Sequence, residues 1–579
     1  MIRRSAPTAQ RWPWIVAVIL VIVNLLWTGG LALSHDKALN DRLGYYLVAE
    51  TMASRGKIAT TAKADPRAPD ADPPYAVGER PLYPLLVSLV FRLVGPSVQA
   101  ANFVSALMRA LTLLPVFALA LALFDPRAAL VAGLLYTFSP TWTGLGATAM
   151  TETTFTFFVY LMLWAFVASW QHPSRLLSLL AGFAFALATL TREEGLVLGL
   201  FLAGILLFRR RFMELALFLL VPVILLGSWR FFLWENFGSV VYTPRPHFVI
   251  GHYEFYFALT LPGLREYLVS VGGWSEAINL RLFNYVAFLR NLMADGLILD
   301  IGQAGLFPVT FLVPLGVIGA RLWRDLQARD ERARLACLLT LGMIMQGAAA
   351  IGFFGLPQGA GGEIRQLQAI TPFLIVLAAA GLVQLWDWSV LGRGLVIALA
   401  IQFLLFCGLY QSLLIDALVV APPDSSADIQ ALRQVAPNLD PDTVLMSRKP
   451  DRAAHYANHP AVIMPLAGFR DLMTYAQAHH VTHLVVTPRE LRTRPGLGEG
   501  LASVGKSVEL LLEVDNTQIL EVHDYEFLPA IEEGGPLDQE IDLAAPMPPP
   551  DWRALLRRAT LSTLDQIQQT WQRWLGSTP

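Results

Sequence analysis

Long apolar stretches recur along the chain, and they constrain its fold more than any other feature. The core of a bilayer takes about 20 apolar residues per helix, and stretches of that order follow one another over residues 14–415. The chain is 55% hydrophobic and 15% charged, whereas soluble domains carry about 25% charged residues. We predict a polytopic α-helical membrane protein with about eleven transmembrane helices. They are expected over 14–34, 97–123, 128–147, 152–170, 176–191, 194–208, 213–234, 304–321, 335–354, 368–386 and 393–415.

Arginines between these stretches indicate the orientation, because short cytoplasmic loops carry an excess of basic residues. Arg3 and Arg4 precede the first stretch. Alternate connections then carry Arg127, Arg175, Arg209, Arg210, Arg211, Arg321, Arg324, Arg329, Arg332, Arg334 and Arg393. We therefore expect a multi-pass plasma-membrane protein with the N-terminus inside, and an odd number of spans places the C-terminus outside.

The outer segments differ in kind from the inner ones. A long polar loop covers residues 35–80, and a second long outer segment covers 235–303. Pro81–Val94 is apolar but too short to span, so it is expected to lie at the interface or to re-enter. Together with the spans, these segments form a predicted transmembrane domain over 1–415.

After residue 415 the composition becomes that of a soluble domain, and alternating strand and helix patterns predict a small extracytoplasmic α/β domain over 416–528. Strands are expected at Thr443–Met446 and His483–Thr487, and helices at Ala427–Val435 and Phe469–His479. Residues 529–579 are expected to form a Pro-rich linker and an amphipathic helix over about 551–575.

Charge and cysteine content exclude several classes of protein. The net charge of −2 gives no basic field for nucleic acid. The two cysteines, Cys337 and Cys407, lie in apolar runs, which argues against a disulfide scaffold or a zinc site. Asp70 and Asp72 form an isolated acid pair, and the histidines near the predicted second strand are typical of a surface. These histidines are His479, His480 and His483. No metal site and no cofactor are expected.

Ionisable groups beside apolar spans are costly, so they are candidates for function. Five separate stretches bring such groups to the predicted outer surface: Asp41; Glu152; Arg192, Glu193 and Glu194; Arg230 and Glu235; Glu363 and Arg365. In a cleft there, a carboxylate has the chemistry of a general base and an arginine that of a phosphate ligand. Each residue also has a structural interpretation, as a helix cap, a dipole partner, an interfacial salt bridge or a snorkelling anchor.

Six short motifs, in order, resemble those of the GT-C glycosyltransferases, and most closely those of the branch of protein O-mannosyltransferases and lipid A aminoarabinose transferases. They are Asp41-x-x-x-Tyr45-Tyr46-x-x-Ala49, Arg80-Pro81-Leu-Tyr83-Pro84, Thr151-Glu152-Thr153, Leu190-Thr-Arg192-Glu-Glu-Gly195, Trp229-Arg230 through Thr243-Pro244, and Glu363-Ile-Arg365 with Thr371-Pro372-Phe373. The resemblance covers about residues 14–415. Asp41 lacks the adjacent acid of the O-mannosyl branch, and this departure leaves the class of acceptor open.

The resemblance implies an inverting transfer of a hexosyl or pentosyl group from a polyprenyl-phosphate carrier to a lipid, glycan or protein acceptor at the outer face. It implies that Asp41 is the general base and Glu152 a second active-site acid. Arg192 or Arg365 would face the carrier phosphate. Glu193, Arg230, Tyr45 and Tyr83 would contribute to substrate binding.

Three alternatives stay open at this point. An oligosaccharyltransferase or sugar polymerase shares the topology and would need a divalent ion. A transporter of an anionic or sugar-like solute would place polar residues near the midplane in broken helices, often within repeats, and no repeat is visible. A non-catalytic scaffold with an outer binding domain would survive the loss of Asp41.

Overall fold

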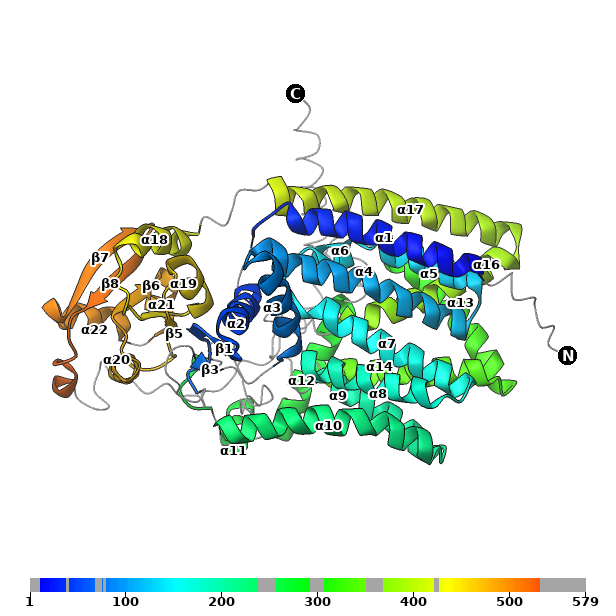
Figure 1. Cartoon of the computed structure of the whole chain (residues 1–579), viewed down its shortest axis with the longest axis horizontal. Helices are drawn as coiled ribbons and strands as arrows, with labels where there is room; N and C mark the ends of the chain where they lie inside the picture. Colours follow the sequence, from blue (N-terminus) through cyan, green and yellow to red (C-terminus); the bar gives the residue numbers. More distant parts are fainter. Residues whose placement is uncertain are drawn as a thin grey trace, which may run out of the picture.

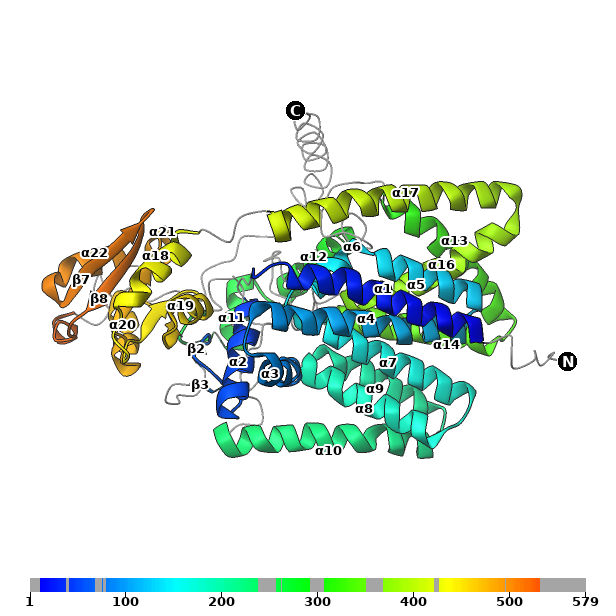
Figure 2. The same cartoon turned by 45° about the horizontal axis from the view of Figure 1, so that its top comes forward.

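The described part of the chain is mostly helical and elongated (Figure 1). Long helices lie side by side to form a bundle, and a sheet with short helices lies beyond one end of it, in both views (Figures 1 and 2). The computed structural model describes residues 11–37, 41–67, 75–76, 80–237, 257–261, 263–291, 307–349, 368–420, 426–494 and 496–531.

The helices of the bundle overlap the predicted spans. Within the described residues, five helices are long and apolar enough to cross a bilayer, namely α1, α4, α7, α10 and α16, and α8, α9 and the described part of α17 form shorter apolar helices. The bounds are α1 (Arg11–Leu33), α4 (Val98–Leu123), α7 (Thr151–Gln171), α8 (Arg175–Thr191), α9 (Glu194–Phe208), α10 (Phe212–Phe237), α13 (Phe307–Gln327), α14 (Glu331–Ala349), α16 (Thr371–Trp388) and α17 (Val390–Ile415).

The stretch predicted as one span over 128–147 is broken in the structure. It forms α5 (Pro126–Phe138) and α6 (Pro140–Gly146), with the residue between them outside either helix, at φ −62° and ψ 117°. Proline has no N–H and disfavours the helical conformation in the residue before it. The prediction of a single helix was wrong because it rested on length and hydropathy and ignored the Ser139-Pro140 pair.

Arg109 of α4 is fully buried at this break. Its Nη2 donates to the carbonyl oxygens of Thr137, at 2.8 Å, and Ser139, at 3.5 Å, and its Nη1 donates to the Thr28 hydroxyl of α1. A Cβ at Gly146 would lie 2.6 Å from the Arg109 Cδ, so glycine leaves room for the arginine. Arg109 therefore satisfies the Thr137 carbonyl at the end of α5 and joins α1 and α4 to the break.

The arginine-bearing connections gather at the end of the bundle where α1 begins, which we call the arginine end. Arg127 pairs with Asp387 at 2.7 Å, joining the start of α5 to the end of α16. Trp170 at the end of α7 donates to Glu331 at the start of α14, at 3.1 Å, and the Arg211 guanidinium lies 5.0 Å from the Trp170 ring centroid. These contacts thus join α5 to α16 and α7 to α14 at this end.

Short elements cover the opposite end, which we call the sheet end (Figure 1). α2 (Asp41–Arg55) packs on α3 (Leu82–Val94), and Arg92 Nη2 donates to the Met52 carbonyl at 2.9 Å. The 13 residues of α3 extend about 20 Å, too short to span a bilayer, as predicted for this segment. The bounds of the other short elements are β1 (Ala59–Thr60), β3 (Tyr75–Ala76), α11 (Leu264–Val271) and α12 (Trp274–Asn291).

A six-stranded sheet follows in the order β2-β5-β4-β6-β8-β7. Its first four strands are parallel, and β8 and β7 are antiparallel to their neighbours. The edge strand β2 comes from the connection between α1 and α3, about 400 residues before its neighbour β5. The bounds are β2 (Ala62–Lys63), β4 (Leu445–Ser447), β5 (Ala461–Ile463), β6 (His483–Val486), β7 (Val508–Val514), β8 (Thr517–Val522), α18 (Ala427–Val435), α19 (Pro450–Ala457), α20 (Phe469–Ala478), α21 (Pro488–Thr493) and α22 (Leu497–Ser503).

β4, β6, α18 and α20 coincide with the strands and helices expected from the sequence, to within two residues at each end. The strand β2 was not expected in this sheet. The predicted amphipathic helix at the C-terminus lies outside the described residues.

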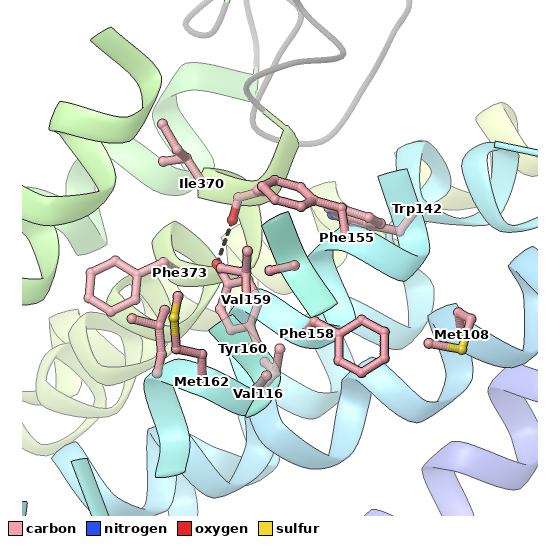
Figure 3. Close-up of a cluster of buried hydrophobic side chains, with 14 of the residues drawn as sticks. Met108, Val116, Trp142, Phe155, Phe158, Val159, Tyr160, Met162, Ile370 and Phe373 are labelled. Atoms are coloured by element: carbon pink, nitrogen blue, oxygen red, sulfur yellow. Dashed lines mark hydrogen bonds between the residues drawn. The ribbon is translucent and has the colours of Figure 1, made fainter. Parts of the chain in front are cut away.

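Aromatic side chains of α7 fill the middle of the bundle (Figure 3). The Tyr160 hydroxyl donates to the Ala369 carbonyl at 2.8 Å, just before α16 begins. Apolar side chains on the outer helices point away from this core, such as Leu26 of α1, 70% exposed, and Val223 of α10, 69% exposed. An apolar exterior of this kind is suited to lipid.

Replacing Arg109 by Met is expected to lower the free energy of unfolding by about 2–4 kcal/mol, because the buried Thr137 carbonyl at the helix break loses its donor. Arg127→Met is the matched control, since that arginine is 58% exposed and its pair contributes about 1 kcal/mol or less. The temperature at which half of the protein aggregates in detergent measures both. Equal temperatures for the two variants would show that Arg109 does not hold the break together.

Candidate functional site

A buried arginine between two carboxylates lies at the sheet end of the bundle. Nη1 of Arg192 donates to Oε1 of Glu152 at 3.3 Å, and Nη2 donates to Oε1 of Glu194 at 3.1 Å. The three side chains are 7%, 4% and 3% exposed, respectively. Charges buried to this extent depend on one another, because removing one leaves another uncompensated.

The hairpin between α8 and α9 positions two of these residues. α8 ends at Thr191, and Arg192 is extended at φ −152° and ψ 136°, with its N–H bonded to the Ala188 carbonyl at 2.9 Å. A Cβ at Gly195 would lie 3.0 Å from the Ala188 carbonyl carbon, so glycine allows α9 to return closely against α8. Glu194, the first residue of α9, is thereby brought beside the guanidinium.

Glu152 is held by the start of α7. It lies in the first turn, where the helix dipole favours a carboxylate, and Thr151 accepts a further hydrogen bond from Arg192 at 3.3 Å. The residue that precedes α7, Met150, is fixed through both its N–H and its carbonyl to the Ser105 hydroxyl, at 3.1 and 3.2 Å. The Tyr83 hydroxyl lies 2.9 Å from the Ser105 hydroxyl oxygen. A chain of hydrogen bonds thus runs from α3 to the backbone of Met150, two residues before Glu152.

Two side chains complete the cluster from the connection between α1 and α3. The ring of Tyr45 on α2 meets that of Tyr83 edge to face, with centroids 5.6 Å apart. Tyr45 and Arg80 are both close enough to interact electrostatically with Arg192, and Arg80 also with Glu194. Arg80 has φ +53°, a left-handed conformation that is uncommon outside glycine and that recurs at functional sites.

Glu193 takes a different direction from its two neighbours in the sequence. It pairs with Arg230 of α10 at 3.6 Å, and these side chains are 45% and 39% exposed. The pair lies on the rim of the buried cluster, where solvent screening weakens it.

The structure thus brings together Tyr45, Tyr83, Glu152 and Arg192, four of the residues predicted for the site. Asp41 is the first residue of α2, and its side chain lies outside the described residues. Arg365 lies outside them as well, as do Glu363, Asp70 and Asp72.

The histidines of the C-terminal region have separate surroundings. His479 Nε2 lies 3.2 Å from Lys63 Nζ, and His483 Nδ1 lies 2.9 Å from the Thr482 hydroxyl. Within the described residues, no group of three or more His, Cys, Asp or Glu side chains is arranged to hold a metal ion.

From the sequence, Glu194 is a candidate only as a charged group beside an apolar span, and neither Glu194 nor Arg80 is assigned a role in the site. The sequence offers Glu193 and Glu194 as equal candidates, and the turn that buries one of them is set by the contact of Gly195 with α8. Arg80 stands at the start of a recognised motif, but its proximity to Arg192 depends on how α3 packs. A basic residue directly before a proline that opens an apolar helix was the available signal.

A family model matches the part of the chain that holds most of this cluster. The family described as dolichyl-phosphate-mannose-protein mannosyltransferase matches residues 73–234, which span α3 to most of α10. The matched range includes Arg80, Glu152, Arg192 and Glu194, and it begins after Asp41. No curated protein matches the chain.

Solved structures share the fold. ArnT from Cupriavidus metallidurans bound to undecaprenyl phosphate superimposes with a TM-score of 0.53 and 16% identity, covering 89% of this chain and 98% of ArnT. The archaeal oligosaccharyltransferase AglB from Archaeoglobus fulgidus, in complex with an inhibitory peptide and a dolichol-phosphate, superimposes with a TM-score of 0.53 and 14% identity, covering 86% of this chain and 72% of AglB. Together with its apolar helices, this fold makes the chain a multi-pass membrane protein. Part of the chain is thus similar to a mannosyltransferase family, and the chain shares the fold of the membrane glycosyltransferases ArnT and AglB.

Proposed function

We propose that this chain is an inverting glycosyltransferase that moves a hexosyl or pentosyl group from a polyprenyl-phosphate carrier to a lipid, glycan or protein acceptor. The observation that carries the proposal is the buried cluster of Glu152, Arg192 and Glu194 at the sheet end of the bundle, directly beside α2. A cluster of charges at the end of a membrane bundle suits a substrate whose lipid tail stays in the bilayer. ArnT and AglB were solved with lipid phosphates bound, which supports a donor of this class.

Asp41 is the proposed general base. It opens α2, one helical turn before Tyr45, whose ring contacts Tyr83 beside the cluster. In the proposed step the acceptor oxygen forms a bond to the anomeric carbon from the face opposite the phosphate, and the carbon–oxygen bond to the phosphate breaks. The acceptor proton passes to the Asp41 carboxylate, and polyprenyl phosphate leaves with the electron pair.

The arginines are the proposed ligands of the departing phosphate. Two carboxylates balance Arg192 and the nearby Arg80, so the cluster is neutral overall before a donor binds. Glu152 and Glu194 hold the guanidinium rigidly, and a cation fixed in this way stabilises developing charge without reorganising. Arg230 and Glu193, on the rim, are proposed to contact the sugar–phosphate from the side of α10.

Arg365 is proposed to join this site, on grounds of chain length. It precedes Ala369 by four residues, which span at most about 14 Å. The Tyr160 hydroxyl donates to the Ala369 carbonyl. Tyr160 itself lies about 12 Å along α7 from Glu152. The segment is therefore long enough to bring Arg365 near the buried cluster.

The site is proposed to face outward from the plasma membrane. The connections rich in arginine gather at the arginine end, away from the cluster and the sheet. Since basic connections favour the cytoplasm, the sheet end would be extracytoplasmic.

Asp41→Asn is expected to slow the release of polyprenyl phosphate by about 100-fold or more, because the acceptor keeps its proton. Purified protein in nanodiscs is given a panel of polyprenyl-phosphate sugars with cell lipid and glycan extracts, and release is followed by mass spectrometry. Asp36→Asn is the matched control, since that exposed carboxylate precedes α2 on the same connection. Equal rates for Asp41→Asn and wild type would remove Asp41 as the base.

Glu152→Gln and Glu194→Gln are each expected to lower kcat by about 10–100-fold, because Arg192 loses one of its two anchors in a buried site. Glu214→Gln is the control for the loss of an Arg–Glu pair, since Arg211 and Glu214 pair at 2.7 Å at the arginine end. The same release assay is used. Unchanged kcat in both site variants, with the Glu214 variant also unchanged, would separate the cluster from catalysis.

An oligosaccharyltransferase is the second candidate, and the fold shared with AglB favours it specifically. The two candidates differ in their expected need for a divalent ion. We expect that EDTA leaves the rate of polyprenyl phosphate release within about twofold of the untreated rate, because the proposed site uses arginines for the phosphate. A loss of turnover that Mg²⁺ or Mn²⁺ restores would favour the oligosaccharyltransferase.

A further inference from the structure

The C-terminal region, described over residues 426–494 and 496–531, contacts α2, the helix that carries the proposed base Asp41, at several points. The proposed function leaves these contacts unexplained. The region supplies β4 to β8, but its sheet is completed by β2 from the connection that carries α2. The N–H of Ala461 donates to the Thr61 carbonyl at 2.9 Å, and Lys63 Nζ lies 3.2 Å from His479 Nε2. The chain that follows α2 is thus fixed to the sheet.

A second contact is made on α2 itself. α19 packs against both α2 and β2. Its His455 meets the Tyr46 ring edge to face, with centroids 5.1 Å apart. Burial lowers the pKa of His455, and the nearby Arg433 lowers it further, so the imidazole against Tyr46 is neutral at pH 7.

A third contact lies in the first turn of α2. A Cβ at Gly44 would lie 3.5 Å from each carboxylate oxygen of Asp451 on α19. A carboxylate from the C-terminal region thus lies in van der Waals reach of the turn that begins with Asp41. A carboxylate is favourable beside the N-terminal turn of a helix, where backbone N–H groups are exposed.

α2 also has a face that belongs to the site. Tyr45 meets Tyr83, and Tyr83 reaches the start of α7 through Ser105. Tyr46, the next residue, is the one that contacts α19, and it also contacts Phe91 of α3 at 5.2 Å. One helix therefore carries the proposed base, faces the buried cluster and is held from another side by the C-terminal region.

We propose that Asp451 and His455 of the C-terminal region are positioning residues for the proposed reaction, which hold the first turn of α2 and thereby set the place of Asp41. The inference rests on the proposed function. A shift of about 1 Å in a reacting group is enough to slow a reaction severely. The C-terminal region then acts on the chemical step without touching the substrate.

The first test compares Asp451→Ala with Asp442→Ala, which removes an exposed carboxylate from the turn before β4. Asp451→Ala is expected to lower kcat for polyprenyl phosphate release by about 10-fold or more, with KM for the donor within about twofold of wild type. A kcat equal to that of Asp442→Ala would overturn the proposal, and so would a change confined to KM.

A tether separates positioning from misfolding. Gly44→Cys combined with Asp451→Cys places two thiols where a disulfide joins α2 to α19. In its reduced form the double variant is expected to be about 10-fold slower than wild type, and in its oxidised form to regain at least about half of the wild-type kcat. The single variant Asp451→Cys under the same oxidant controls for Cys337 and Cys407. Equal rates in the two redox states would contradict the proposal.

If the proposed function is wrong, the wild-type protein releases no polyprenyl phosphate from any donor, and this outcome is distinct from those above. Hydrogen exchange over residues 41–55 then decides the structural claim. Faster exchange there in Asp451→Ala than in Asp442→Ala supports the hold on α2, and equal exchange overturns it.

Discussion

A charge or a free carbonyl that is removed from water must find its partner within the protein, and this constraint organises the bundle around two arginines. Arg109 bonds to carbonyls at a helix break and closes a defect in the backbone. Arg192 bonds to carboxylates of two helices and forms a centre of charge. The first arrangement fixes an arginine against backbone carbonyls that cannot move, which suits a structural role. The second joins side chains at the end of the bundle, where a substrate can approach.

The position of that centre follows from the packing of helix ends. α7 and α9 both begin at the sheet end, and each brings a carboxylate in its first turn. Helix dipoles make such positions favourable for anions, and an arginine from the intervening hairpin then offsets two negative charges in one place. α2 adds Tyr45, whose ring contacts Tyr83. The edge strand β2, which follows α2 in the connection between α1 and α3, pairs with β5. Elements that are remote in sequence therefore define one site because their ends meet.

The sequence predicts those features that depend on local composition. Apolar length locates the helices, and the arginines of the connections identify one end of the bundle. The acids at the opposite end, Glu152 among them, stand out because charge beside apolar spans is costly. Contacts made by packing are beyond such reasoning. The two residues of β2 have no strand signal, since their order comes from hydrogen bonds to a strand 400 residues later. Glu194, and not Glu193, is the acid buried beside Arg192, and this likewise depends on how closely α8 and α9 approach.

The charge balance of the cluster bears on how a donor would be held. Two arginines and two carboxylates leave a neutral site, so a phosphate that carries negative charge gains little from the cluster as a whole. It gains from a local arrangement in which guanidinium groups face it and carboxylates lie behind them. Rigid placement then matters more than net charge, because misplaced groups present the carboxylates to the phosphate instead. Tyr83 and Ser105, which fix the start of α7, and Gly195, which fixes the hairpin, supply that placement from three separate elements.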